Sequence, residues 1–193
     1  MNLPNKLTVL RIFMIPVFIL FLVIPMNLGT VSSLGSVIPV THLIAAIIFA
    51  VASFTDWLDG KIARAQGLVT NFGKFADPLA DKMLVMTAFI MLVELKMAPG
   101  WVVSIIVCRE LAVTGLRLLL VEQGGTVLAA ALPGKIKTFT QMLAIILLLI
   151  ANYPFQKTGI RVDLIMLYTC LFFTIYSGAD YFIQNKTVFK DVD

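Results

Sequence analysis

Four aspartates stand close together in a chain that is otherwise strongly apolar. They are Asp56, Asp59, Asp77 and Asp81, and small residues lie between the two pairs. Residues three or four apart share one face of a helix, so the two carboxylates of each pair point in one direction. Ionised carboxylates within a membrane are costly unless they are paired or bind cations. We therefore predict a metal-binding catalytic centre at a membrane surface.

The carboxylate set predicts Mg²⁺ or Mn²⁺, because these hard cations prefer oxygen ligands and also bind substrate phosphates. Two ions about 4 Å apart would stabilise the entering and leaving oxygens of a phosphoryl displacement. Gly60, Ala63 and Gly73 have little side-chain bulk, so a nucleotide or a pyrophosphate group could lie close to the backbone. The alternative is that the aspartates cap helices or pair with neighbouring basic residues, which are Lys61, Arg64, Lys74 and Lys82.

The composition is typical of an integral membrane protein. Of the 193 residues, 60% are hydrophobic and 13% are charged, and the mean hydropathy is +0.97. A soluble domain would carry about a quarter charged residues. No stretch is left for a second core, so we expect one domain over residues 1–193. The net charge of +4 indicates orientation in the membrane and anionic lipid as a partner, with no role for nucleic acid.

Six apolar segments predict an all-α integral membrane protein with six transmembrane helices. Each segment is about long enough to cross ~30 Å of hydrocarbon, and backbone groups in lipid must be satisfied internally, which favours helices. The first apolar run could mimic a signal peptide, but it lacks a small-residue cleavage site, so we expect a retained helix. The expected helices cover residues 7–24, 40–58, 73–95, 100–121, 135–152 and 160–183.

The basic residues predict the orientation, because cytoplasmic segments carry an excess of Lys and Arg. With the N-terminus inside, nine basic residues fall on the inner side and three, Lys96, Lys157 and Arg161, on the outer side. We therefore expect a multi-pass plasma-membrane protein with both termini in the cytoplasm. A polar chamber open to the cytoplasm would collect the charged residues of the inner half, namely the four aspartates, Arg109, Glu110, Arg117, Lys135, Lys137 and Asp180. The sequence does not decide whether Asp180 caps the sixth helix or contacts this chamber.

The aspartate segment resembles the signature of the CDP-alcohol phosphatidyltransferase family. The pattern Asp-x₂-Asp-Gly-x₂-Ala-Arg-x₈-Gly-x₃-Asp-x₃-Asp runs from Asp56 to Asp81 and agrees at every specified position. The family is similar in overall plan, with six helices and a polar active site at the cytoplasmic face, so the resemblance covers essentially the whole chain. It implies transfer of a phosphatidyl group from CDP-diacylglycerol to an alcohol, with release of CMP.

The same resemblance implies a role for each residue of the signature. Asp56, Asp59 and Asp77 would bind the metals, and Asp81 would contribute a ligand and act as general base on the acceptor hydroxyl. A base helps because an alcohol is a poor nucleophile at neutral pH, and the metals would suppress charge repulsion from the diphosphate. The implied CDP site comprises Asn5, Thr8, Gly60, Ala63, Arg64 and Gly73.

The signature does not specify the acceptor alcohol, so we infer it from the charged residues outside the signature. Arg109 and Arg117 lie on one side of the fourth expected helix, and buried arginines in a membrane need anionic partners. Glu110 can serve one of them, which leaves a cation available for a substrate phosphate. Lys135 and Lys137 add positive charge at the start of the fifth helix. The alternative is that Arg109, Glu110 and Arg117 form an internal salt-bridge network.

Residues 4–11 with Pro16, together with the surroundings of Arg109, Arg117 and residues 134–138, resemble the branch of the family that uses sn-glycerol 3-phosphate. On that resemblance the free primary hydroxyl attacks the lipid-side phosphorus and gives phosphatidylglycerophosphate, and a homodimer is plausible. Within the family, inositol phosphate, inositol, serine or phosphatidylglycerol are alternative acceptors. A divalent-cation transporter and a small membrane scaffold are the alternatives outside it. The acceptor phosphate would be bound by Arg109, Arg117, Lys135 and Lys137.

Overall fold

Six α-helices make up most of the described chain in the computed structural model, and each predicted helix is found. The structure describes the backbone of residues 3–66, 71–122 and 132–185, and their side chains except at 3–6, 56–66, 71–78, 81 and 121–122. The helices are α1 (Leu3–Val23), α2 (Val40–Gln66), α3 (Asn71–Glu94), α4 (Gly100–Glu122), α5 (Leu132–Leu149) and α6 (Val162–Gln184).

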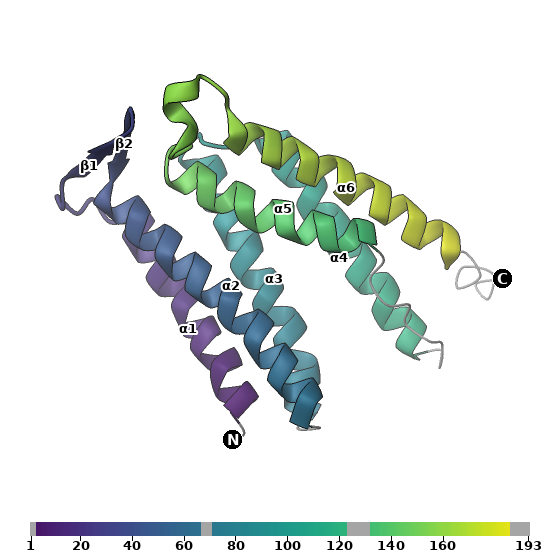
Figure 1. The fold of residues 1–193 in the computed structure, drawn as a ribbon. Helices are drawn as coiled ribbons and strands as arrows, with labels where there is room; N and C mark the ends of the chain where they lie inside the picture. The colour runs from purple at the N-terminus through teal and green to yellow at the C-terminus, as the bar shows by residue number, and fades with distance from the viewer. Residues whose placement is uncertain (1–2, 67–70, 123–131, 186–193) are drawn as a thin grey trace.

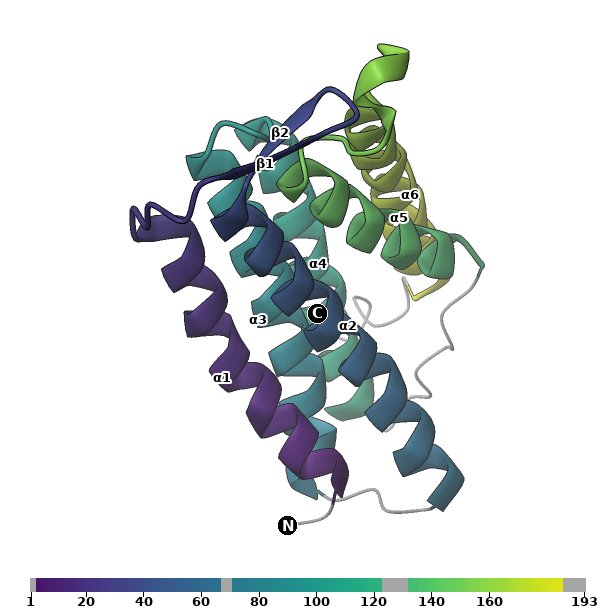
Figure 2. The same cartoon turned by 60° about the vertical axis from the view of Figure 1, so that its left-hand side comes forward.

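The helices form two groups, which meet where α5 packs against α2 and α3 and where α3 contacts α4. In the first group α1 packs against both α2 and α3, and α2 contacts α3 (Figure 1). In the second group α6 packs against α5 and α4. The start of α1 and the adjoining ends of α2 and α3 lie at one end of the bundle in both views (Figure 2). This end therefore gathers the segments that carry the aspartate signature and the N-terminal motif.

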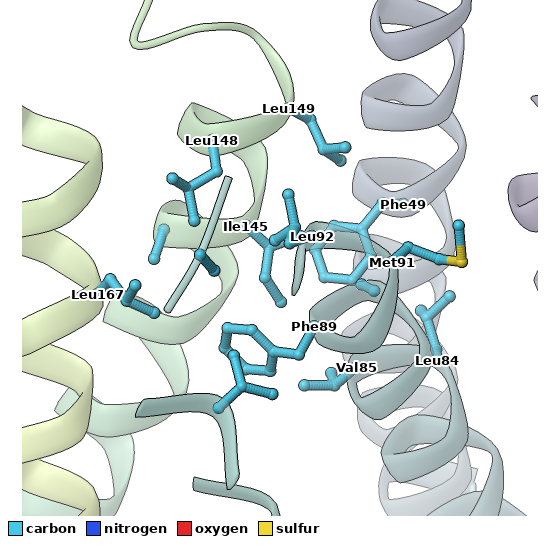
Figure 3. Close-up of a cluster of buried hydrophobic side chains, with 14 of the residues drawn as sticks. Phe49, Leu84, Val85, Phe89, Met91, Leu92, Ile145, Leu148, Leu149 and Leu167 are labelled. Atoms are coloured by element: carbon cyan, nitrogen blue, oxygen red, sulfur yellow. The ribbon is translucent and has the colours of Figure 1, made fainter. Parts of the chain in front are cut away.

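A core of apolar side chains joins the two groups. Phe49 of α2, Phe89 and Leu92 of α3, and Ile145 of α5 are fully buried and belong to one cluster (Figure 3). Leu167 of α6 completes the contact from the second group. Close packing of such side chains supplies dispersion energy even where lipid removes the usual hydrophobic driving force.

The outer surface of the bundle is apolar as well. Large hydrophobic side chains are exposed on all six described helices, among them Phe13, Leu118 and Phe172, which are 67%, 67% and 63% exposed. Soluble proteins rarely present so continuous an apolar surface to water. By length and composition, two of the described helices, α5 and α6, are apolar enough to cross a bilayer. These features indicate a membrane environment, and the count of six spans stays a prediction.

The second helix is longer than predicted. The helix was expected to end at residue 58, but α2 continues to Gln66, so Gly60, Ala63 and Arg64 lie on a helix. Asp56 and Asp59 consequently lie inside α2. The prediction was wrong because it followed hydropathy, which drops at the membrane surface, whereas Lys, Ala, Arg and Gln favour a helix in water as well.

The expected loop at Asn27–Pro39 contains a β-hairpin that the all-α prediction missed. Strand β1 (Thr30–Ser33) pairs antiparallel with β2 (Ser36–Pro39). Leu34 and Gly35 form the turn with φ of 48° and 82°. Positive φ at both central residues gives the turn type whose twist matches a two-residue hairpin. The Leu-Gly pair at this position, between Thr, Val and Ile residues, was the overlooked signal.

The connection between α5 and α6 is organised around Asn152, which is buried. Its amide nitrogen donates to the Ile160 carbonyl (2.8 Å), and its amide oxygen accepts from the backbone N–H of Asp163 (3.1 Å). Ala151 and Asn152 both have positive φ, so the helix ends at Leu149 and not at residue 152 as predicted. The Ser36 hydroxyl donates to the Ala151 carbonyl (3.1 Å), which ties the hairpin to this connection.

Candidate functional site

The aspartate signature lies on two antiparallel helices that contact each other. Asp56 and Asp59 belong to α2, and Asp77 and Asp81 belong to α3. The last residues of α2 and the first residues of α3 lie at the same end of the bundle (Figures 1 and 2). The side chains of the predicted metal and CDP residues lie outside the described part of the chain at Asn5, Asp56, Asp59, Gly60, Ala63, Arg64, Gly73, Asp77 and Asp81.

Thr8 is the residue of the predicted CDP site whose side chain is described. Thr8 and Arg11 are each 0% exposed and lie one turn apart on α1. Ile15 and Phe18 continue the same face into the apolar core. This face packs against α2 and α3, so α1 presents a polar first half to the two helices of the signature and an apolar second half to the core.

Glu110 is the centre of a cluster of charged side chains from three helices. Its Oε2 accepts a hydrogen bond from Lys82 Nζ of α3 (3.0 Å). Its Oε1 accepts from Arg109 Nη1 of α4 (3.1 Å) and forms an ion pair with the ammonium of Lys137 of α5. One carboxylate thus faces three cations, and two positive charges stay uncompensated among the side chains that the structure describes.

The cluster lines a cavity of about 200 Å³ between α3, α4 and α5. Apolar side chains such as Phe89 and Ile106 close the side toward the core, and polar groups face it from Thr138 and Gln141 of α5. Lys82 directly follows Asp81 along α3, so the cavity begins one residue beyond the last aspartate of the signature. The arrangement is a cationic pocket, which suits an anionic ligand.

The two predicted arginines have different partners. Arg109 joins the Glu110 cluster and also donates from Nη2 to the Ser177 hydroxyl of α6 (2.8 Å). The guanidinium carbon of Arg117 lies 5.3 Å from the centre of the Tyr181 ring, and Arg117 lines the same cavity. In the described chain no ion pair joins Arg117 to Glu110. The salt-bridge alternative therefore describes Arg109 and Glu110, and it does not extend to Arg117.

The two predicted lysines lie on opposite sides of α5. Lys137 is 7% exposed and lines the cavity, whereas Lys135 is exposed and lies away from it. Residues two apart on an α-helix point in directions about 200° apart, so the two ammonium groups cannot share one small pocket.

Asp180, whose role the sequence left open, accepts a hydrogen bond from Gln184 of its own helix (2.8 Å).

A comparison with known families identifies the chain. The model of the family described as CDP-alcohol phosphatidyltransferase matches residues 1–176. The chain belongs to this family. The identification confirms the resemblance that rested on the aspartate signature.

Several curated relatives of this phosphatidyltransferase match over nearly its whole length. The CDP-diacylglycerol–glycerol-3-phosphate 3-phosphatidyltransferase of Bacillus subtilis (strain 168) is 48% identical over 189 residues, which are 98% of this chain and 97% of the relative. The enzyme with the same name from Rickettsia typhi is 38% identical, over 97% and 99% of the two chains. The probable phosphatidylglycerophosphate synthase of Mycobacterium tuberculosis (strain ATCC 25618 / H37Rv) is 38% identical, over 93% and 79%.

Some cavity residues of this phosphatidyltransferase were missed by sequence reasoning. Lys82 was considered only as a partner for the aspartates, and Glu110 as a member of the polar chamber and a partner for the arginines. Gln141 was not considered, and neither was Ser177, which bonds to Arg109 but does not line the cavity. A lysine within an apolar helix was the available signal for Lys82, because it needs an anionic partner at that depth. That its partner is Glu110 follows only from the contact between α3 and α4.

Proposed function

We propose that the chain transfers the phosphatidyl group of CDP-diacylglycerol to sn-glycerol 3-phosphate, giving phosphatidylglycerophosphate and CMP. This reaction belongs to phosphatidylglycerol biosynthesis. The names of relatives that are 38–48% identical over nearly all of the chain support the activity. The cluster of Lys82, Arg109 and Lys137 around the single carboxylate of Glu110 is the structural observation that supports the acceptor.

The charge of this cluster favours a phosphorylated acceptor. Burying an unpaired cation is costly, so the uncompensated charges of the cavity would be stabilised by an anion that enters it. A phosphate monoester carries up to two negative charges and offers three acceptor oxygens to Arg109, Lys137 and Lys82. Arg117, on the same cavity, supplies a further guanidinium. Lys135 would act from outside the pocket, by raising the local positive potential.

Inositol and serine would leave the cluster less well compensated, because inositol is neutral and serine carries an ammonium group as well as a carboxylate. Inositol phosphate and phosphatidylglycerol also carry a phosphate, so charge alone does not separate them from glycerol 3-phosphate. The names of the relatives favour glycerol 3-phosphate among the phosphorylated acceptors.

The donor set of the signature fits a site for Mg²⁺ or Mn²⁺. Two carboxylates on each of two helices in contact would provide an all-oxygen ligand set, which hard divalent cations prefer. Asp56, Asp59 and Asp77 would hold two ions, with a ligand from Asp81. When bound, the ions would supply neutralisation of the diphosphate charge.

The remaining steps belong to the chain's own residues. Asp81 would take the proton from the primary hydroxyl of the acceptor. At the same time the hydroxyl oxygen would form a bond to the lipid-side phosphorus. The bond from that phosphorus to the bridging oxygen breaks, and CMP leaves with the electron pair. Arg109 and Lys137 would hold the acceptor phosphate during attack, which converts a bimolecular encounter into a reaction of oriented groups. The CDP site would be lined by Asn5, Thr8, Gly60, Ala63, Arg64 and Gly73.

The same proposal includes placement in the membrane. All six helices would span the plasma membrane as one domain over residues 1–193, with both termini and the polar chamber on the cytoplasmic side. Exposed apolar side chains on all six described helices support this placement. A homodimer would be consistent with it.

The deciding experiment measures CMP release from CDP-diacylglycerol by the purified protein in detergent micelles, one acceptor at a time. Glycerol 3-phosphate is expected to give turnover well above inositol, inositol phosphate, serine and phosphatidylglycerol. Turnover with another of these alcohols and none with glycerol 3-phosphate would reject the proposed acceptor. Uptake of Mn²⁺ into vesicles containing the protein, without CMP release, would instead establish the transporter alternative.

A further inference from the structure

The two arginines of the proposed acceptor site are both held by α6. Arg109 Nη2 donates to Ser177 Oγ (2.8 Å), and the Arg117 guanidinium lies over the Tyr181 ring at 5.3 Å. Ser177 and Tyr181 are four residues apart, so they lie on one face of α6, one turn from each other. Arg109 and Arg117 are two turns apart on α4. One face of α6 therefore contacts both guanidinium groups.

The Ser177 hydroxyl is oriented to accept from Arg109. It donates its proton to the Phe173 carbonyl one turn earlier (2.5 Å), which leaves its lone pairs for the guanidinium. Arg109 Nη1 is held at the same time by Glu110 (3.1 Å). A planar guanidinium fixed at both terminal nitrogens cannot rotate freely, and each of these nitrogens keeps a second N–H for an anion.

Gly178 lets the arginine approach the backbone of α6. A Cβ at this position would lie 3.0 Å from Arg109 Cγ and 3.1 Å from Arg109 Nε, closer than side chains normally pack. Gly178 is itself buried. The side chain of Arg109 thus lies on a surface that only glycine leaves open, while its end is held by the neighbouring Ser177.

We propose that Ser177, Gly178 and Tyr181 form a positioning element on α6 that orients Arg109 and Arg117 for the phosphate of the acceptor. The inference rests on the proposed function, since it assumes that the cavity receives this phosphate. The three residues do not line the cavity, whereas both arginines do. Their effect is therefore indirect: they determine the direction of the guanidinium donors, on which bidentate binding of a phosphate depends.

The test compares the Michaelis constants for the two substrates in matched variants. Ser177→Ala removes the acceptor of the Arg109 bond. Ser104→Ala is its control, because Ser104 of α4 makes the same kind of backbone bond, to the Gly100 carbonyl (2.9 Å), and is exposed. Ser177→Ala is expected to raise the KM for glycerol 3-phosphate about tenfold and to leave the KM for CDP-diacylglycerol unchanged. Ser104→Ala is expected to change neither.

Tyr181 provides a second and independent pair of variants. Its hydroxyl is buried without a hydrogen-bond partner among the described residues, so the ring, not the hydroxyl, is the group that holds Arg117. Tyr181→Leu is expected to raise the KM for glycerol 3-phosphate severalfold, and Tyr181→Phe is expected to retain the wild-type value. Tyr176→Leu is the matched control, because Tyr176 is exposed and its ring stacks on Phe172.

Gly178→Ala completes the set, with Gly115→Ala as its control because a Cβ at Gly115 meets nothing within 4 Å. Thermal unfolding in detergent checks that each variant is folded. Suppose that the wild-type protein turns over glycerol 3-phosphate, but the Ser177 and Tyr181 variants change both KM values equally or neither. The positioning element is then rejected, and the proposed function stands. If the wild-type protein releases no CMP with glycerol 3-phosphate, the proposed function fails and the inference with it.

Discussion

Glu110 on α4 and Lys137 on α5 form a buried ion pair that joins the two helices beside the cavity. Lys82 of α3 binds the other carboxylate oxygen of Glu110, so that three helices meet at one side chain. Breaking a buried pair costs more than the pair contributes, because the remaining charge is left without compensation. Glu110 is therefore required both for the packing of α3, α4 and α5 and for holding the cations at the cavity.

Glu110→Gln should destabilise the fold. The substitution leaves Lys82, Arg109 and Lys137 facing one another without an anion, and removal of one partner from a buried network costs about 3–5 kcal/mol. The free energy of unfolding in detergent measures this loss. Glu94→Gln at the exposed end of α3 is the matched control and should change stability by less than about 0.5 kcal/mol. Equal effects of the two variants would contradict the role of Glu110.

Lys137→Met and Lys135→Met should differ strongly in activity. Lys137 lines the cavity and is buried, so its loss removes a charge-assisted contact to the acceptor phosphate. We expect kcat/KM for glycerol 3-phosphate to fall about 100-fold. Lys135 is exposed and away from the cavity, so its variant should lose less than about threefold. A larger loss at Lys135 than at Lys137 would place the phosphate outside the cavity.

Asp81→Asn should abolish CMP release and leave the fold intact. An amide cannot take the proton of the acceptor hydroxyl, and it is a weaker ligand for a hard cation. CMP release and thermal unfolding are measured on the same preparation. Asp180→Asn serves as the comparison, because Asp180 bonds only to Gln184 among the described side chains and does not line the cavity. Full CMP release by Asp81→Asn would reject Asp81 as the general base.

Removal of divalent metal should stop the reaction reversibly. With EDTA present we expect no CMP release, because the diphosphate charge would be unneutralised at the aspartates. Addition of Mg²⁺ or Mn²⁺ in excess should restore the rate. Activity that persists in EDTA after extensive dialysis would reject the metal site.

The proposed orientation can be tested by cysteine labelling in intact cells. In a background of Cys108→Ser and Cys170→Ser, Lys157→Cys should react with a maleimide that does not cross membranes. Lys135→Cys should react only after the membrane is permeabilised. Both positions are exposed in the structure, so a difference in reactivity reports the side of the membrane. Labelling of position 135 from outside would reverse the orientation.

Local features of the chain could be predicted well. The spacing from Asp56 to Asp81 identified the family, because the family signature specifies particular residues at particular intervals along the chain. The six helices could be predicted because apolar segments in lipid must satisfy their own backbone groups. The end of α2 and the hairpin at residues 30–39 could not, because both depend on backbone preferences outside the apolar segments.

The partners of the charged residues were decided by the tertiary structure alone. The sequence showed that Arg109, Glu110, Arg117 and Lys137 were unusual in an apolar chain, and it paired the first three by their spacing along one helix. The folded chain instead brings Lys82 and Lys137 to Glu110 from other helices, and Ser177 and Tyr181 to the arginines from α6. Contacts between helices depend on how the helices cross and rotate against one another, which the packing of whole apolar faces determines.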